Sequence, residues 1–277
     1  MQKILVTTDF SANSKAGLRF AIQLASQHKY ELTFFHSYHL VKPTSWSDAT
    51  FQSHKKVETK KIQDQLNNFV DTVYKSMNII PRNSKCIIIN SVFADANIRE
   101  YAAQEKFNYI CISTRGAGKL KKIFGTNTSN LINQSDVPVI AVPSFYRAEK
   151  ITNILYASDL TQLEKELKQV VNFAKPIKAR VELLHFISPL EIITDSKIIE
   201  TAVKKFSKYD IKLHLENPKH VETFITNIES AIKKSKSSMM IMFTQQNRTF
   251  FEKLFLSSNS AEYSFNAKVP VLVFKKI

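Results

Sequence analysis

The stretch Ile4-Leu5-Val6-Thr7-Thr8-Asp9-Phe10-Ser11 is an apolar run that ends abruptly at polar residues. Such a run, followed by Asp and Ser ahead of a helical pattern, is typical of a buried strand that leads into a helix. The stretch recurs as Ile154-Leu155-Tyr156-Ala157-Ser158-Asp159-Leu160-Thr161. An internal repeat of this kind predicts two copies of one structural pattern.

Two further pairs of segments follow in the same order. Leu32–His36 (LTFFH) resembles Val181–His185 (VELLH), and Val137–Val142 (VPVIAV) resembles Val269–Phe274 (VPVLVF). A short polar stretch around a proline, Pro143–Lys150, separates the copies. We therefore predict two domains, residues 1–144 and 150–277.

Each copy alternates strand and helix patterns, with a polar loop expected over 38–53. In the first copy we expect strands at Ile4–Thr8, Leu32–His36, Cys86–Ile89, Tyr109–Ser113 and Val139–Val142, and helices after a cap at Ser11 or Asn13 and at 54–77, 95–105 and 126–134. In the second copy we expect strands at Ile154–Ala157, Val181–Phe186, Ile211–Leu215, Met239–Phe243 and Val271–Phe274. This alternation predicts α/β domains, each a parallel sheet with helices on both faces.

The composition excludes several classes of protein. The chain has 277 residues, of which 44% are hydrophobic and 23% charged, so it is neither disordered nor fibrous. Apolar runs such as Met239–Phe243 fall far short of the roughly 18 residues of a membrane span, and no signal-peptide pattern opens the chain. Cys86 and Cys111 form no metal or disulfide spacing. We expect a cytoplasmic protein with free thiols and no membrane partner.

The chain is strongly basic, with a formal net charge of +15. Such a surface attracts polyanions, but it is also an ordinary solvated surface. Lys55-Lys56 and Lys60-Lys61 fit the solvated face of a helix, with a nucleic-acid patch as the weaker interpretation. No helix-turn-helix, aromatic stacking platform or zinc spacing is visible, so we expect no specific nucleic-acid partner.

The glycines mark the strongest candidate for a binding loop. Three of the four, Gly116, Gly118 and Gly125, lie in one loop that leaves a strand and reaches a helix start. Glycine lets a backbone approach phosphate closely, and the amides of 126–128 would be unpaired donors at the positive end of that helix. Threonine hydroxyls there and Arg115 would add further donors. Anion binding and a purely structural turn with a helix cap remain equally open.

Ligands of such sheets bind beyond the carboxyl ends of the strands. That edge would gather Asp9, the residues after His36 and the loop after Ser113. Asp9 fits a ligand contact and a helix cap equally well. His36 and His185 sit at matching strand ends without a catalytic or metal constellation, which favours a packing role.

These residues together resemble the universal stress protein family. The resemblance rests on the Asp-ended first strand, the Leu-Leu-His-like second strand, the glycine loop and the closing Pro-Val strand, and it covers nearly the whole chain as two fused copies. It implies a five-stranded sheet of order 3-2-1-4-5 in each copy and pairing of the two halves through their last strands. One branch of that family binds ATP and another does not.

The family's nucleotide motif is Gly, two residues, Gly, nine residues, Gly, then Ser or Thr. Here Ser113 replaces the first Gly, and only eight residues separate Gly116 from Gly125. Carried over by position, the resemblance puts Thr7, Thr8, Asp9 and Ser37 beside the nucleoside. It puts Ile112, Ser113, Arg115 and Gly116 at the ribose and phosphates, and Gly125, Thr126, Asn127 and Thr128 along the phosphate chain.

The second copy keeps the spacing but no glycine. It reads Thr244-Gln245-Gln246-Asn247, nine residues, then Ser257-Ser258. We expect no triphosphate there and regard Asp159 as a helix-start residue. ATP, with Mg²⁺, is thus expected in the N-terminal copy alone.

Three functions fit this sequence. The first is a non-enzymatic stress-response regulator that binds an adenine nucleotide and acts on an unidentified protein partner. The second is an interaction module of the same fold without nucleotide. The third, a phosphate-hydrolysing or phosphate-transferring enzyme, fits least, because Asp9 is the one obvious acidic group near the crevice and such chemistry needs a metal clamp and a positioned base. The tandem chain forming a homodimer is compatible with each.

Overall fold

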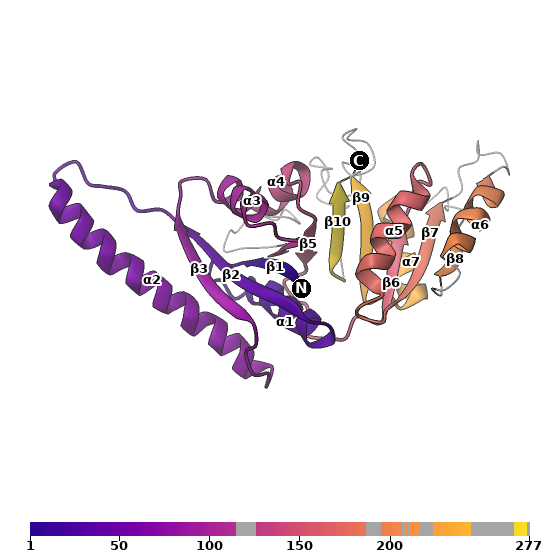
Figure 1. The fold of residues 1–277 in the computed structure, drawn as a ribbon, viewed down its shortest axis with the longest axis horizontal. Coiled ribbons are helices and arrows are strands. Elements are labelled where there is room, and N and C mark those ends of the chain that lie inside the picture. The colour runs from indigo at the N-terminus through magenta and orange to yellow at the C-terminus, as the bar shows by residue number, and fades with distance from the viewer. Residues whose placement is uncertain are drawn as a thin grey trace. The chain divides into compact units, whose positions relative to one another are not determined.

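A computed structural model describes residues 1–114, 126–186, 195–206, 209, 211–216, 224–244 and 269–275. The chain divides into two units, Met1–Ala148 and Glu149–Ile277. Both are α/β units in which strands and helices alternate along the chain (Figure 1). Each unit is described by itself.

The first unit holds a five-stranded parallel sheet. Its elements are β1 (Gln2–Thr7), α1 (Lys15–Gln27), β2 (Tyr30–Tyr38), α2 (Asp48–Ser76), β3 (Ser84–Asn90), α3 (Ala94–Gln104), β4 (Tyr109–Ser113), α4 (Thr126–Gln134) and β5 (Val139–Val142). The strand order is β3-β2-β1-β4-β5, and the pairs are parallel. Ile4, Leu5 and Val6 are fully buried, because β1 lies between two neighbouring strands in the middle of the sheet.

The second unit repeats this topology. Its elements are β6 (Asn153–Ala157), α5 (Leu163–Ala174), β7 (Arg180–Phe186), α6 (Asp195–Lys205), β8 (Ile211–Glu216), α7 (Phe224–Ser235), β9 (Met239–Thr244) and β10 (Val271–Lys275). Taken from its outer edge, the sheet has the order β8-β7-β6-β9-β10, again with parallel pairs. The α/β class and the order 3-2-1-4-5 expected for each copy are therefore confirmed.

Helix α2 starts earlier than the sequence pattern predicted. It begins at Asp48 rather than near residue 54, so the polar loop expected over 38–53 is wrong for residues 48–53. The Oγ atom of Ser47 accepts a hydrogen bond from the Thr50 amide at 3.1 Å, which caps the helix. Leu66, on the inward face of this helix, is buried, whereas Phe69 is only half-buried.

The cap predicted for α1 was also wrong. The N-cap is Ser14, which makes no capping hydrogen bond with its side chain. Ser11 instead accepts a hydrogen bond from the Ser14 amide through its Oγ atom at 3.1 Å, which closes a turn ahead of the helix. Asn13 contributes its carbonyl, which accepts from the Ala16 amide. The residues after β1 thus form a turn of their own before α1 begins.

Helix α5 buries one residue that its apolar pattern did not predict. The apolar residues Leu167 and Val170 are fully buried, and so is most of Glu166, which is 3% exposed. The hydroxyl of Tyr156, on β6, donates to the Glu166 carboxylate. This bond offsets part of the cost of burying an acidic group.

Candidate functional site

The first unit gathers polar residues where β1, β2 and β4 reach their carboxyl ends. Thr8 and Asp9 follow β1, Ser37 lies near the end of β2, and Ser113 ends β4. The Thr8 amide donates to the Phe35 carbonyl at 3.0 Å, which ties the end of β1 to β2. These residues lie at the edge of the sheet where the sequence placed a binding site, and we call them the strand-end site.

A tight turn follows β1 at the strand-end site. The Asp9 carboxylate accepts from the Ser11 amide at 3.0 Å, and the Thr8 hydroxyl accepts from the Phe10 amide at 3.1 Å. Phe10 is left-handed, with φ of 61°, a conformation uncommon for a bulky side chain. Its ring lies 4.1 Å from that of His36, and this packing holds the turn in place. Asp9 therefore holds a turn and does not cap α1.

His36 has the structural role that was expected of it. Its Nδ1 atom lies 2.8 Å from the Thr8 carbonyl, which can only accept, so this nitrogen carries the proton. Burial lowers the pKa of His36 from its ordinary value of 6.5. The ring therefore fixes the end of β2 against the turn after β1 as a neutral hydrogen-bond donor.

Three elements meet at the end of β4. The Ser113 hydroxyl donates to the Asn13 carbonyl at 2.9 Å, and the Thr128 hydroxyl, on α4, donates to the Ser113 carbonyl at 3.1 Å. A Cβ on Gly17 would lie 3.3 Å from the Ser113 amide nitrogen, so α1 and β4 are in close contact. Thr128 was expected to offer its hydroxyl to phosphate. That expectation was wrong, because the hydroxyl is buried and bonded to β4.

The side chains open to a ligand are fewer than the sequence predicted. Asp9 and Asn127 are exposed, and Ser37 and Ile112 are half-buried. Thr7, Thr8, Ser113 and Thr128 are at least 93% buried, so contacts from these positions would come from their backbone or through neighbours.

Sequence reasoning missed Asn97, on α3. Its Nδ2 atom donates to the Ser37 hydroxyl oxygen at 3.1 Å, across a long stretch of chain. The adjacent Ile98 is buried, which fits the helical pattern of α3, but no feature of that pattern places Asn97 beside β2. The hydroxyl of Ser37 keeps one proton that it can donate to a ligand.

Part of the predicted site lies outside the described residues. This holds for Arg115, Gly116 and Gly125, and for the second-copy residues 245–247 and 257–258. Thr126 is described only as the first residue of α4, and its side chain is not described.

The second unit has the same turn after its first strand, but different residues are buried next to that turn. Asp159 accepts from the Thr161 amide at 3.1 Å, and Leu160 has φ of 65°, matching Phe10. The Nδ1 atom of His185 bonds the Ser158 carbonyl at 2.9 Å, as His36 does in the first unit. Asp159 thus holds a turn, and the prediction that it starts α5 was wrong, because that helix begins at Leu163.

Beneath this turn, Tyr156 stands where the first copy has Val6. Its hydroxyl donates its proton to the buried Glu166 carboxylate and lies 2.9 Å from the Ser158 hydroxyl oxygen. Burial, and then the nearby Glu166, raise the pKa of Tyr156. The first unit has an apolar core at this place, and the second has a buried carboxyl group bonded to Tyr156.

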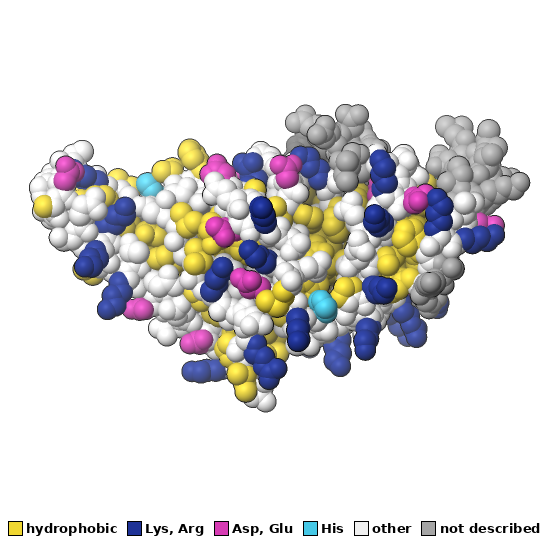
Figure 2. Space-filling model, in the orientation of Figure 1, with side chains coloured by type: hydrophobic (Ala, Val, Ile, Leu, Met, Phe, Trp, Pro, Cys, Tyr) yellow, Lys and Arg dark blue, Asp and Glu magenta, His cyan; other side chains and the backbone are white. Residues whose placement is uncertain are grey.

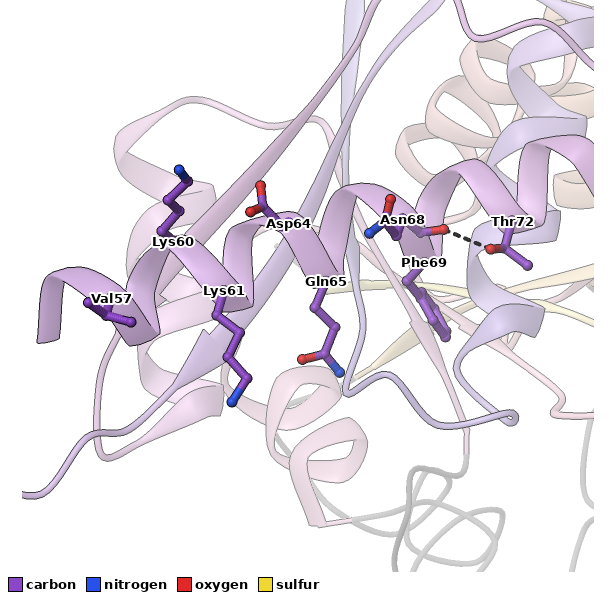
Figure 3. A pocket seen from close by; sticks show the side chains of 8 residues that line it. All are labelled: Val57, Lys60, Lys61, Asp64, Gln65, Asn68, Phe69 and Thr72. Atoms are coloured by element: carbon purple, nitrogen blue, oxygen red, sulfur yellow. Dashed lines mark hydrogen bonds between the residues drawn. The ribbon is translucent and has the colours of Figure 1, made fainter. Parts of the chain in front are cut away.

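Away from the strand-end site, one face of α2 borders a shallow hollow of about 800 Å³ (Figure 3). Its side chains, which include Lys60, Lys61 and Asp64, come from this single helix and do not converge on a point. The Thr72 hydroxyl donates to the Asn68 carbonyl at 2.7 Å. The lysines are exposed, as expected for a solvated helix face.

The remaining chemistry is sparse in the part of the chain that the structure describes. Cys86 and Cys111 are free thiols, and burial raises the pKa of Cys86 to about 11. The described residues contain no group of three or more His, Cys, Asp or Glu side chains placed to hold a metal ion. None of their helices is long and apolar enough to cross a membrane.

Proteins of known structure share this fold. A search of curated proteins finds no match to this sequence. A universal stress protein from Archaeoglobus fulgidus has a similar structure, with a TM-score of 0.69 and 17% identity, over 99% of this chain and 98% of that one. A candidate universal stress protein from Pseudomonas aeruginosa follows, with a TM-score of 0.55 and 17% identity, over 99% and 93%. At such identities these likenesses concern the fold.

The sequence itself supplies the assignment. The model of the universal stress protein family matches residues 1–143, which is the first unit with its Asp9 turn and the strand ends around it. More than half of the chain is covered by that match, and the second unit repeats the topology. The chain therefore belongs to the universal stress protein family.

Proposed function

We propose that this protein is a stress-response regulator whose first unit binds an adenine nucleotide, such as ATP with Mg²⁺, without turning it over. The observation that carries the proposal is the strand-end site, where Asp9, Ser37 and Asn127 are accessible at the carboxyl ends of β1 and β2 and the start of α4. Ligands of parallel α/β sheets bind at such an edge.

Each accessible group has a role that fits a nucleotide. Asp9 has a carboxylate oxygen suited to a ribose hydroxyl or a base amino group, and its turn with Ser11 fixes its direction. Ser37, oriented by Asn97, offers a proton to a base nitrogen. The amides at the start of α4, at the positive end of a helix, suit phosphate oxygens. Mg²⁺, when present, would neutralise phosphate charge.

We assign this binding to the first unit alone. In the second unit the buried Glu166 carboxylate lies close to the turn, since Tyr156 bonds both Glu166 and Ser158. The first unit has the buried Val6 at this place, so the second unit does not reproduce the surroundings of the first turn. The replacement of every motif glycine in the second copy acts in the same direction.

Regulation would follow from differential binding. A protein partner that prefers either the nucleotide-bound or the nucleotide-free form is released or recruited as the nucleotide level changes. Turnover is not part of the proposal. Asp9 already accepts a hydrogen bond in its turn, and Ser37 and Asn127, the other accessible residues named for the strand-end site, are not acidic.

The test is calorimetric titration of nucleotide-stripped protein with ATP and Mg²⁺. We expect about one site per chain, and at least a tenfold loss of affinity in Asp9→Ala. Asp159→Ala is the matched control, because it removes the same turn from the second unit and should leave affinity unchanged. Gly116→Val tests the loop separately. Absence of binding at millimolar ATP would favour the interaction module, and phosphate release would favour an enzyme.

A further inference from the structure

A second concave region lies at the opposite end of the first unit, where the strands begin. It is a hollow of about 1040 Å³ between the end of α1, the start of β2, and the end of α2 with the turn that follows. We call it the basic hollow, after the residues that line it: Ile22, Lys29, Tyr30, Tyr74, Ile79 and Arg82. Its volume lies near the upper end of the roughly 300–1,000 Å³ typical of small-molecule sites.

The inner wall of the basic hollow is apolar. Ile22, Tyr30 and Tyr74 are each at most 3% exposed and form a fixed surface under it. At the rim the pattern reverses, because Ile80 is 77% exposed and Met1 is 72% exposed. Large apolar side chains in the open beside an apolar hollow mark a surface that gains from being covered.

The polar part of the rim is entirely cationic or neutral. Lys29 and Arg82 are exposed, and His28 is beside them. No Asp or Glu is among the residues that line the hollow, all of which are described. In Figure 2, basic and apolar side chains gather at the end of the first unit where α2 finishes.

A smaller hollow of about 360 Å³ shares Ile79 with the first. Arg19 and Arg147 line it, and its lining, all within the described chain, again contains no acidic residue. The positive charge therefore continues beyond the basic hollow.

Compensation of helix dipoles does not account for these cations. Basic residues stabilise a helix C-terminus within its last turn. Helix α1 has no basic residue in its last turn, and Lys29 follows the helix after its end at Gln27. Arg82 lies further from the end of α2, at Ser76.

We propose that the basic hollow binds an amphipathic anion, an aliphatic chain that ends in a carboxylate. The chain would lie along the accessible side chains of Met1, Ile79 and Ile80, and the carboxylate would meet the guanidinium of Arg82 in a two-pronged contact, with Lys29 on the same rim. The basic hollow is separate from the strand-end site, and this proposal does not depend on the proposed nucleotide binding.

The test is calorimetric titration of the full-length protein with dodecanoate below its micelle concentration. We expect saturable binding of one dodecanoate per chain, and weaker binding by at least about tenfold in Arg82→Glu. Ile80→Ser should weaken binding about threefold or more through lost apolar contact. Both side chains are exposed, so each variant should keep the circular dichroism spectrum of the parent.

Lys56→Glu is the matched control, because it makes the same charge change at an exposed position of α2 outside the hollow, and affinity should stay within about twofold. Dodecanol, with the same chain and no charge, should bind at least about tenfold more weakly. The proposal is overturned if dodecanoate does not saturate, if Lys56→Glu matches Arg82→Glu, or if dodecanol binds equally. Binding only to phosphatidylglycerol vesicles would also overturn it and indicate a membrane surface.

Discussion

Four hydroxyl groups at the carboxyl end of the first sheet are bonded within the protein, although their positions match a nucleotide motif. Thr128 is the clearest case, since its hydroxyl bonds the Ser113 carbonyl at 3.1 Å. Sequence position predicted which residues lie at this edge, but the direction of a hydroxyl is set by its tertiary neighbours. For the same reason the role of Asn97 could not be predicted from the sequence, because its partner Ser37 lies on a different element.

Tyr156 offers a test of a single buried hydroxyl. Tyr156→Phe removes the hydroxyl that donates to Glu166 and contacts Ser158, so a buried carboxylate loses a partner. We expect the free energy of unfolding to fall by about 1–3 kcal/mol, measured by urea unfolding.

Tyr38→Phe serves as the control for this prediction. It removes a half-buried hydroxyl that bonds Thr59 at 2.9 Å, where water can replace the lost partner. We expect a loss of under about 1 kcal/mol. Equal losses in the two variants would contradict a special role for the Glu166 bond.

Among the secondary-structure elements, strands were predicted better than helix ends. The predicted bounds of β4 and β5 match the structure, because Asn108 marks the start of β4 and prolines 138 and 143 flank β5. Helix α2 was begun six residues late, because the stretch Asp48–Ser53 carries no apolar face that periodicity could detect. Its start is marked by the Ser47 cap, a signal independent of hydrophobic period.

Ser47→Ala tests whether this cap acts on the helix end alone. Hydrogen exchange at the amides of Thr50 and Phe51 should quicken, since a lost cap costs about 0.5–2 kcal/mol and this first turn is largely exposed. The global unfolding midpoint should move much less than in Leu66→Ala, where a buried side chain costs about 2–5 kcal/mol.

Ser45→Ala, an exposed serine ahead of the cap, should leave exchange at Thr50 and Phe51 unchanged. If Ser47→Ala instead lowered the midpoint as much as Leu66→Ala, the first turn of α2 would have to be coupled to the core.

At the scale of the whole molecule, the internal repeat predicted both topologies. Phe10 and Leu160 have the same left-handed conformation in matching turns. His36 bonds the Thr8 carbonyl, and His185 bonds the Ser158 carbonyl in the same way. Divergence within the repeat could not be predicted, because Glu166 lies among charged residues in α5 and only the fold shows that it points inward.

Both units bury tyrosines whose ionisation opposes the folded state, which predicts alkaline unfolding. Burial raises the pKa of Tyr109 to about 12, and burial also raises those of Tyr30 and Tyr156 above the ordinary value of about 10. The folded protein therefore holds protons that the unfolded chain releases. Stability from these groups is complete below about pH 10 and is lost as pH rises through the raised values.

The measurement is urea unfolding at steps from about pH 8 to about pH 11, with tyrosinate absorbance followed in the same samples. Each tyrosine that ionises only on unfolding contributes a slope of up to about 1.4 kcal/mol per pH unit. Tyr30→Phe should make the slope shallower, because it removes one such group, whereas Tyr38→Phe, at a half-buried position, should alter it less. Tyrosinate that formed fully before unfolding began would show that these hydroxyls reach water in the folded state, contrary to their burial.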